Sequence, residues 1–410
     1  MGVRSPHLYA ALRGFCFGAF AYLYRESSED APLAFAFEEH SSPGRPALYE
    51  YRPLARGYVE GRAHALARLE DARFAVEELA REPAAAIFAR AHSPGQRVGK
   101  TALFRTVLLP LLSGVAEQCG GFEWDDRVFD RAYHELEHSL FGERRAYGAA
   151  APLVGLSTPV PVELGKGLRL RPAATGEFSA CWPEAKGLLP PGFGEKPERA
   201  CVIEVELPLE GGAVERPDAP GEIADAVTAL RLATAAPVAA GPVLFERLDW
   251  RPLGVRPVLP IAAAEPEGEP TRLDEFRARL GRDVLTRLGV CEDDSRLEEA
   301  LDRWELALFA DRAARAEQLQ GSLLELLGGG DGLWAASARV AVLLGESPRA
   351  RADLFAELRA GGPGPDVVRR ALVEVLMHGD RAALADELDQ SLLGLAPRPQ
   401  SYLDAVRRAA

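Results

Sequence analysis

In the last third of the chain, apolar residues recur at steps of three and four, the spacing that places them on one face of a helix. This spacing predicts a long helix from residue 301 to the three glycines at 328–330, which stop it because glycine tolerates the left-handed turn after a helix. The apolar stripe of this helix consists of Phe309, Ala313, Ala316, Leu319, Leu323 and Leu326. Later helices are predicted over 333–344, 349–359, 366–377, 380–393 and 402–408. The sequence therefore predicts a C-terminal helical bundle, and residues 271–274 resemble a capping box that opens its first helix.

The first 149 residues show mainly helical spacing as well. Helices are predicted over 57–81 and 129–141, with a short apolar element over 103–112. An apolar run at 14–24 has about the length of a signal-peptide core and is too short to cross a bilayer. Because an acidic segment follows it where a small-residue cleavage site would stand, we interpret the run as a buried helix or strand. A signal peptide is the alternative.

Between residues 150 and 261 the helical spacing gives way to alternation. Residues 201–207 alternate apolar side chains with Glu204 and Glu206, as expected of a strand that buries one face. Further strands are predicted over 160–164, 168–170 and 243–248, and one helix is predicted over 222–232. The composition of residues 262–270 is that of a linker.

These patterns predict an α+β protein of three domains. We expect a mainly helical N-terminal domain over 1–149, a β-rich middle domain over 150–261 and the helical bundle over 271–410. At 410 residues the chain is long enough for two or three such domains, each with its own core.

The net charge of the chain limits the kinds of molecule that it is expected to bind. The formal net charge is −13, so a nonspecific coat of nucleic acid is not expected, and only a local basic groove would attract it. The five cysteines are widely separated and include no Cys-x-x-Cys pair. That pattern favours a reducing cytoplasm over a disulfide framework or a structural zinc site. Arginine greatly outnumbers lysine, which indicates a GC-rich bacterial genome.

Three C-terminal segments follow one another in a characteristic order. Residues 324–327 read Leu-Glu-Leu-Leu, residues 339–345 read Arg-Val-Ala-Val-Leu-Leu-Gly, and a later helix ends in His378 and Gly379. This order resembles the Apea-like HEPN domain, a four- to five-helix bundle found in bacterial defence and toxin proteins. Segments upstream, at 102–112, 133–140 and 151–156, are similar to longer members of that family.

The resemblance implies metal-independent RNA cleavage, in which His378 would move protons at the ribose 2′-OH and an arginine would stabilise charge on the phosphate. HEPN nucleases carry an arginine, then four to six intervening residues, then the histidine. The usual position here holds Val373, and the nearest arginines are Arg369 and Arg370. Arg370 and His378 are separated by about 12 Å of helix rise. Arg370 also has an ordinary i+4 partner in Glu374.

Two versions of this function stay open. The protein is either an endoribonuclease that uses His378 with Arg369 or Arg370, or a catalytically degenerate RNA-binding or assembly subunit. The resemblance implies RNA as a partner, together with a homodimer through the C-terminal bundle or a place in a larger defence complex. It implies no cofactor, no metal and no membrane. A pure interaction protein is a further alternative.

Residues 134–138 read His-Glu-Leu-Glu-His and match the zinc-protease pattern H-E-x-x-H. Two histidines at i and i+4 lie on one helix face and can share a zinc ion, while Glu135 would activate the bound water. A zinc-dependent hydrolase that uses His134, Glu135 and His138 is therefore the alternative function. Its third ligand would have to be a carboxylate such as Glu163, which lies in a predicted strand.

Two other groups of residues suggest anion binding. Residues 94–101 match the phosphate-binding loop G-x-x-x-x-G-K-T except that Pro94 replaces the first glycine, so Lys100 is expected at most to bind phosphate as a point charge. Five arginines surround the segment that carries His378, namely Arg349, Arg351, Arg359, Arg369 and Arg370. They would form a local anion site if they converge, and ordinary surface ion pairs with nearby acids if they scatter.

Overall fold

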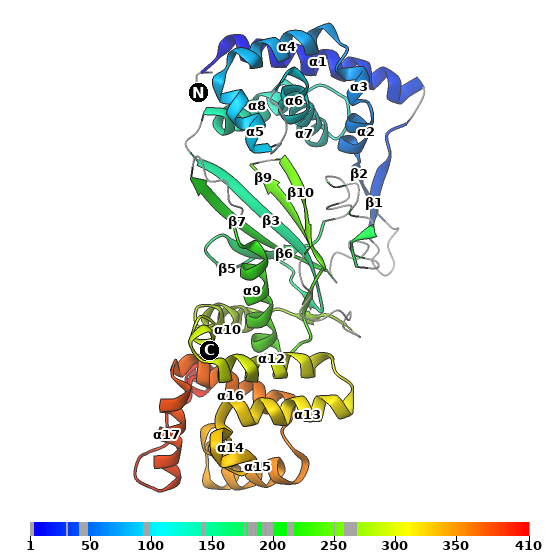
Figure 1. Ribbon diagram of the computed structural model, residues 1–410. Helices are drawn as coiled ribbons and strands as arrows, with labels where there is room; N and C mark the ends of the chain where they lie inside the picture. The colour runs from blue at the N-terminus through cyan, green and yellow to red at the C-terminus, as the bar shows by residue number, and fades with distance from the viewer. Residues whose placement is uncertain are drawn as a thin grey trace.

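The computed structural model is an α+β fold in three tiers, with helices at both ends and an antiparallel sheet between them (Figure 1). The N-terminal helices lie at the top of the view, the sheet and one long helix lie in the middle, and the C-terminal helices lie at the bottom. The structure describes residues 4–29, 32–40, 48–92, 99–141, 144–174, 178, 182, 185, 187–190, 193, 200–210, 217–249, 251–257 and 269–409.

The N-terminal tier is a group of helices packed around aromatic side chains. Its elements are α1 (Pro6–Glu29), β1 (Phe35–His40), β2 (Leu48–Pro53), α2 (Ala55–Gly61), α3 (Ala63–Leu66), α4 (Glu70–Arg81), α5 (Pro83–His92), α6 (Lys100–Leu103), α7 (Leu109–Cys119) and α8 (Asp126–Phe141). The apolar run at 14–24 is part of α1, and its Phe15 and Phe20 are buried in this core with Phe88 and Phe129. Burial of such a ring contributes about 2–3 kcal/mol.

The single helix predicted over 57–81 is wrong. The chain leaves helical geometry at Arg62 and again at Leu69, so three helices occupy this stretch. Arg62 forms an ion pair with Glu26 of α1 and lies over the ring of Tyr58. These contacts between distant segments are invisible to helical periodicity, which is the same on both sides of the break.

The middle tier is a sheet with strand order β10-β9-β3-β7-β6-β5, all paired antiparallel (Figure 1). The strands of this order are β3 (Arg144–Val154), β5 (Val162–Gly165), β6 (Leu168–Pro172), β7 (Cys201–Glu210), β9 (Val243–Leu248) and β10 (Arg251–Pro257). Short pairings add β8 (Ala239–Ala240) to β3, and join β11 (Thr271–Arg272) in parallel to β4 (Leu156–Ser157). The alternation at 201–207 correctly predicts a strand, and β7 extends it to Glu210.

The two faces of the sheet have different covers. The helix α9 (Ala219–Thr234) packs on one face, where Ile203 and Val205 of β7 meet Val227 and Leu230. On the other face, Val202 lies under an aromatic cluster that includes Phe245. Farther along β7 that second face carries Glu204 and Glu206 in place of apolar residues, because successive side chains of a strand point to opposite sides.

The C-terminal tier is a helical bundle. Its helices are α10 (Glu275–Leu285), α11 (Val290–Asp293), α12 (Ser295–Phe309), α13 (Arg312–Leu323), α14 (Gly332–Leu344), α15 (Pro348–Gly361), α16 (Pro365–His378), α17 (Arg381–Leu392) and α18 (Tyr402–Ala409). Trp304 is fully buried in this core, and its ring N–H donates to the carbonyl of Pro365 at 3.1 Å. Ala229 and Leu232 of α9 belong to the same core, so α9 serves both the sheet and the bundle.

Two predictions for this region are wrong. The long helix predicted from 301 is two helices, because Asp311 accepts hydrogen bonds from the N–H groups of Ala313 and Ala314 and so caps a new helix. Ala313 and Ala316 are consequently exposed. The helix after the linker is capped by Asp274, whose carboxylate accepts from the N–H of Arg277, and not by the predicted box at 271–274.

A buried ion pair links the sheet tier to the bundle. Arg231 of α9 lies 3.0 Å from the carboxylate of Glu305 on α12, and their side chains are 1% and 4% exposed. Thr228 donates to the same carboxylate at 2.7 Å, and the Arg231 Nε donates to the carbonyl of Val238 at 2.7 Å. Charges so far from water are tolerated only when partners surround them.

We expect the substitution Glu305→Ala to lower the free energy of unfolding by about 3–5 kcal/mol, because it leaves the Arg231 guanidinium buried without its counter-ion. The measurement is urea denaturation of the full chain. The matched control is Asp353→Ala, which removes the partner of Arg349 in a largely exposed pair and should change the stability little. A Glu305→Ala protein as stable as the control would contradict the role of this pair.

Candidate functional site in the cleft between α8 and the sheet

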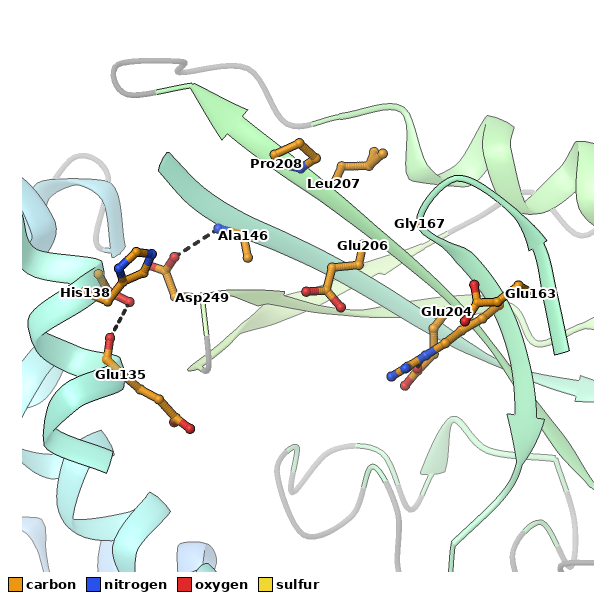
Figure 2. Close-up of a pocket in the computed structure, with 12 residues that line it drawn as sticks. Glu135, His138, Ala146, Glu163, Gly167, Glu204, Glu206, Leu207, Pro208 and Asp249 are labelled. Carbon is orange, nitrogen blue, oxygen red and sulfur yellow. Dashed lines mark hydrogen bonds and ion pairs between the residues drawn. The ribbon is translucent and has the colours of Figure 1, made fainter. Parts of the chain in front are cut away.

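A cleft of about 740 Å³ lies between α8 and the sheet face opposite α9. Figure 2 shows residues of both walls, with Glu135 and His138 on α8 and Glu204 and Glu206 on β7. Side chains of β3, β5, β6 and the β9–β10 turn complete the lining. The cleft is therefore shared by the N-terminal tier and the sheet.

The floor of the cleft contains a carboxylate between two arginines. Glu204 of β7 lies 2.6 Å from Arg169 and 2.6 Å from Arg171, both on β6. Arg169 is the register partner of Glu204, and Arg171 lies two residues farther along the same face. Burial alone would raise the pKa of the Glu204 carboxyl, but the hydrogen bonds and charges of Arg171 and Arg169 outweigh it, so that its pKa lies below the ordinary value.

A second ion pair crosses β3 beside the first. Gly148 of β3 is the register partner of both Glu206 on β7 and Arg247 on β9. The Arg247 side chain lies over this glycine, since a Cβ placed there would be 2.5 Å from its Nε, and it reaches to 3.8 Å from Glu206. Gly148 thus allows an arginine to lie flat across the sheet.

The helical wall follows from the amphipathic character of α8. Its Phe129, Tyr133 and Leu136 are buried in the N-terminal core, which turns Glu135 and His138 outward toward the cleft. Both of these side chains are exposed.

The two tiers meet at one end of the cleft. His92, the last residue of α5, lies 3.6 Å from the carboxylate of Asp249 in the β9–β10 turn, and both side chains are nearly fully buried. Asp249 adopts a positive φ of 58°. Its other carboxylate oxygen accepts a hydrogen bond from the N–H of Ala146 at 3.1 Å. This contact holds the sheet turn against the helices.

The residues of the zinc-protease pattern have separate roles. His134 pairs with Glu137 at 3.7 Å, whereas Glu135 and His138 line the cleft with Glu163 of β5. Within the described residues, no three His, Cys, Asp or Glu side chains converge as metal ligands. The geometry therefore does not favour the zinc hydrolase, although it does bring Glu163 to the same cleft as Glu135 and His138.

His378 ends α16, as predicted, and lies among acceptors. Its Nδ1 is 2.8 Å from the carbonyl of Asp380, and its Nε2 is 3.5 Å from the carboxylate of Glu387 on α17. Gly379 follows in the left-handed region with φ of 85° and ends the helix. The surroundings of the histidine are thus carbonyl and carboxylate oxygens of the next helix.

Arg369, one of the two arginines expected beside His378, is bound elsewhere. Arg369 donates to the carbonyl of Leu232 at 2.8 Å and pairs with Asp366 at 2.7 Å, so it joins α16 to α9. Arg370 lies one residue later on the same helix, and its buried Nε has no hydrogen-bond partner among the described residues. Glu374, its predicted partner, instead accepts hydrogen bonds at the start of α18, from Ser401, Tyr402 and Leu403.

Three of the other anion-binding candidates have individual partners. Lys100 donates to Glu77 at 2.9 Å, and the preceding residues 94–98 of the loop pattern lie outside the described residues. Arg349 pairs with Asp353, and Arg351 donates to the carbonyl of Gly345. Arg349 and Arg351 therefore make separate contacts and do not converge on one anion site. Cys16, Cys119, Cys201 and Cys291 are free thiols, and Cys181 lies outside the described residues.

No family model matches the chain, and neither a curated protein nor a solved structure is similar enough to be matched with it. Within the described residues, no helix combines the length and the apolar character that a membrane span requires.

Most of the cleft was not anticipated from sequence. The alternating pattern placed Glu204 and Glu206 on the solvent face of a strand. No pattern in the sequence singled out Arg169 or Asp249. Arg169 and Arg171 have the same i, i+2 spacing as Glu204 and Glu206. Opposite charges with this spacing on neighbouring strands can pair across a sheet, and this match was the only indication of these ion pairs in the sequence.

We expect Glu204→Gln to lower the free energy of unfolding by about 1–3 kcal/mol at pH 7, because it removes two charge-assisted hydrogen bonds. Since the folded pKa of Glu204 is depressed below the ordinary 4.5, its stabilisation is complete above that value and is lost as the pH falls through the folded pKa. The gap between wild type and variant should therefore shrink below about pH 4.5. Denaturation at several pH values measures it, with Glu206→Gln as the exposed control. A gap independent of pH would contradict the assignment.

Proposed function

We propose that this protein is a bacterial, cytoplasmic, RNA-associated protein of the defence or toxin class whose C-terminal bundle binds and assembles without cleaving RNA. The observation that carries the proposal is the separation of the expected catalytic residues. His378 contacts Asp380 and Glu387, whereas Arg369 is bound to α9 and Asp366.

The chemistry of cleavage explains why this separation matters. A ribonuclease of this kind needs a cation at the phosphate, in the same small site where the histidine moves protons at the ribose 2′-OH. Glu387 places a negative charge 3.5 Å from the His378 ring, which disfavours the approach of a phosphate. Arg369 would have to leave the carbonyl of Leu232 to reach that ring. The arrangement therefore supports the degenerate version of the HEPN-like function over the nuclease.

Exposed apolar side chains support an assembly role for the bundle. Arg339 pairs with Asp331 at the start of α14 and with Asp389 on α17, which brings these two ends together. Trp334 lies one turn after Asp331, Leu393 lies one turn after Asp389, and both side chains are exposed. Large apolar residues grouped on a surface are typical of contact sites. We propose a second copy of the chain as the partner at this surface.

In the presence of EDTA, we expect neither the wild-type protein nor His378→Ala to cleave RNA, because Arg369 is held by the carbonyl of Leu232 and by Asp366. Cleavage is followed on labelled RNA, and binding is followed in the same samples at low salt. Cleavage by the wild type that disappears in His378→Ala would overturn the non-catalytic proposal. The absence of both binding and cleavage would overturn the association with RNA.

We expect the double substitution Leu393→Ser/Leu395→Ser to convert a dimer into a monomer, since it replaces Leu393 of the proposed contact together with Leu395, an exposed apolar residue two positions later. Light scattering after size-exclusion chromatography gives the particle mass. Leu306→Ser, at an exposed apolar position on α12, is the control and should leave the dimer intact. A wild-type protein that is monomeric at all concentrations would contradict this part of the proposal.

A further inference from the structure

The turn that ends α17 is fixed by hydrogen bonds of the backbone. Gly394 adopts a positive φ of 72°, and its N–H donates to the carbonyl of Ser391 at 3.1 Å. The N–H of Leu395 donates to the carbonyl of Gln390 at 2.8 Å. Together these two bonds form a Schellman motif, which satisfies the last carbonyls of a helix and favours glycine at the left-handed position. Residues 393–395, which we call the leucine turn, therefore have a defined conformation.

The leucine turn holds its apolar side chains in water. In a Schellman motif the residue after the glycine commonly packs against the last turn of the helix. Here that residue, Leu395, is 76% exposed, and Leu393 is 74% exposed. No other large apolar side chain among the described residues has so high an exposed fraction. Because exposure of apolar surface to water is unfavourable, a fixed turn that exposes two leucines indicates a contact with another molecule.

Two arginines attach the leucine turn to α14, one on each side of it. Before the turn, the Asp389 carboxylate accepts hydrogen bonds from Arg339 at 2.8 and 2.7 Å. After the turn, Arg398 donates to the carbonyl of Leu343 at 2.6 Å. Arg339 and Leu343 are four residues apart on α14, so the two attachment points lie one helical turn from each other. The segment between Asp389 and Arg398 is thus a short loop with both ends held by the same helix.

Arg339 also determines where α14 begins. Its guanidinium donates to the carbonyl of Leu327 and to the carboxylate of Asp331, each at 2.8 Å. These two residues flank the three glycines that precede α14, whose first turn carries the exposed Trp334. The Arg339 side chain is only 10% exposed. One buried, planar group therefore sets the leucine turn and Trp334 at fixed positions relative to each other.

We propose that the leucine turn is a preorganised contact for a second copy of the chain, and that Arg339 is the residue that positions this turn relative to Trp334. The proposal rests on the assembly role of the bundle and deepens it. A contact whose conformation is already fixed in the monomer loses little conformational entropy on association, which increases the affinity. In a two-fold symmetric dimer both copies present the same turn, so one substitution changes the contact twice.

The first test changes the conformation of the turn without removing apolar surface. Gly394→Ala disfavours the left-handed backbone, whereas the added Cβ lies in open space. We expect the dimer Kd, measured by sedimentation equilibrium of the full chain, to rise about fivefold or more. The matched control is Gly120→Ala. Gly120 ends α7 in the same motif with φ of 73° and open space around its Cβ position, and its substitution should leave the Kd unchanged.

The second test separates positioning by Arg339 from a general effect on stability. Arg339→Lys keeps the charge but loses the two parallel hydrogen bonds to Asp389, and it should raise the Kd about fivefold as well. The double variant Gly394→Ala/Arg339→Lys should dimerise no more weakly than the weaker single variant, because both substitutions release the same turn. Two independent effects would multiply instead. Urea denaturation verifies that each variant is folded.

The remaining outcomes contradict the proposal. A dimeric wild type whose Kd is unchanged in Gly394→Ala and Arg339→Lys would leave the assembly intact and remove the leucine turn from it. Equal weakening by Gly120→Ala would assign the effect to stability, and multiplied effects in the double variant would remove the positioning role of Arg339. A wild-type protein that is monomeric at all concentrations would overturn the assembly itself, and the proposal with it.

Discussion

The buried ion pair between Arg231 and Glu305 determines how the sheet is joined to the C-terminal bundle. Each charge has lost its water and is stable only with the other in place, so α9 and α12 have one favourable alignment. α9 itself belongs to two cores, with Val227 under the sheet and Leu232 in the bundle. The carbonyl of Leu232 then accepts from Arg369. An arginine that resemblance assigns to RNA is thereby used to attach α16 to the helix beneath the sheet.

This junction separates two regions with different chemistry. The bundle contributes helix-to-helix contacts and an exposed apolar surface, and its one surface histidine lies against carbonyl and carboxylate oxygens. The cleft on the far side of the sheet is lined by charged side chains that pair across neighbouring strands.

Periodicity predicted the class of the fold and most of the individual elements, because a helix or strand that buries one face has apolar residues at a regular spacing. It predicted β7 from alternation and α16 from steps of three and four. It failed over 57–81 and at 301–327, where helices end because of contacts with distant residues or a single capping aspartate. It gave no sign of β3, whose run of alanines lacks the β-branched residues typical of strands.

The site was less accessible to sequence than the fold. The sequence did single out Glu135, His138 and Glu163, but as candidate residues of a zinc site. The pairing of the remaining charges depends on strand register, which no local sequence pattern contains. Hydrogen exchange of the full chain and of Glu305→Ala tests most directly whether the buried ion pair aligns the sheet with the bundle. The account predicts faster exchange in α9, α12 and α16 of the variant, with no change in α1 and α8. Unchanged exchange in α9 and α12 would contradict it.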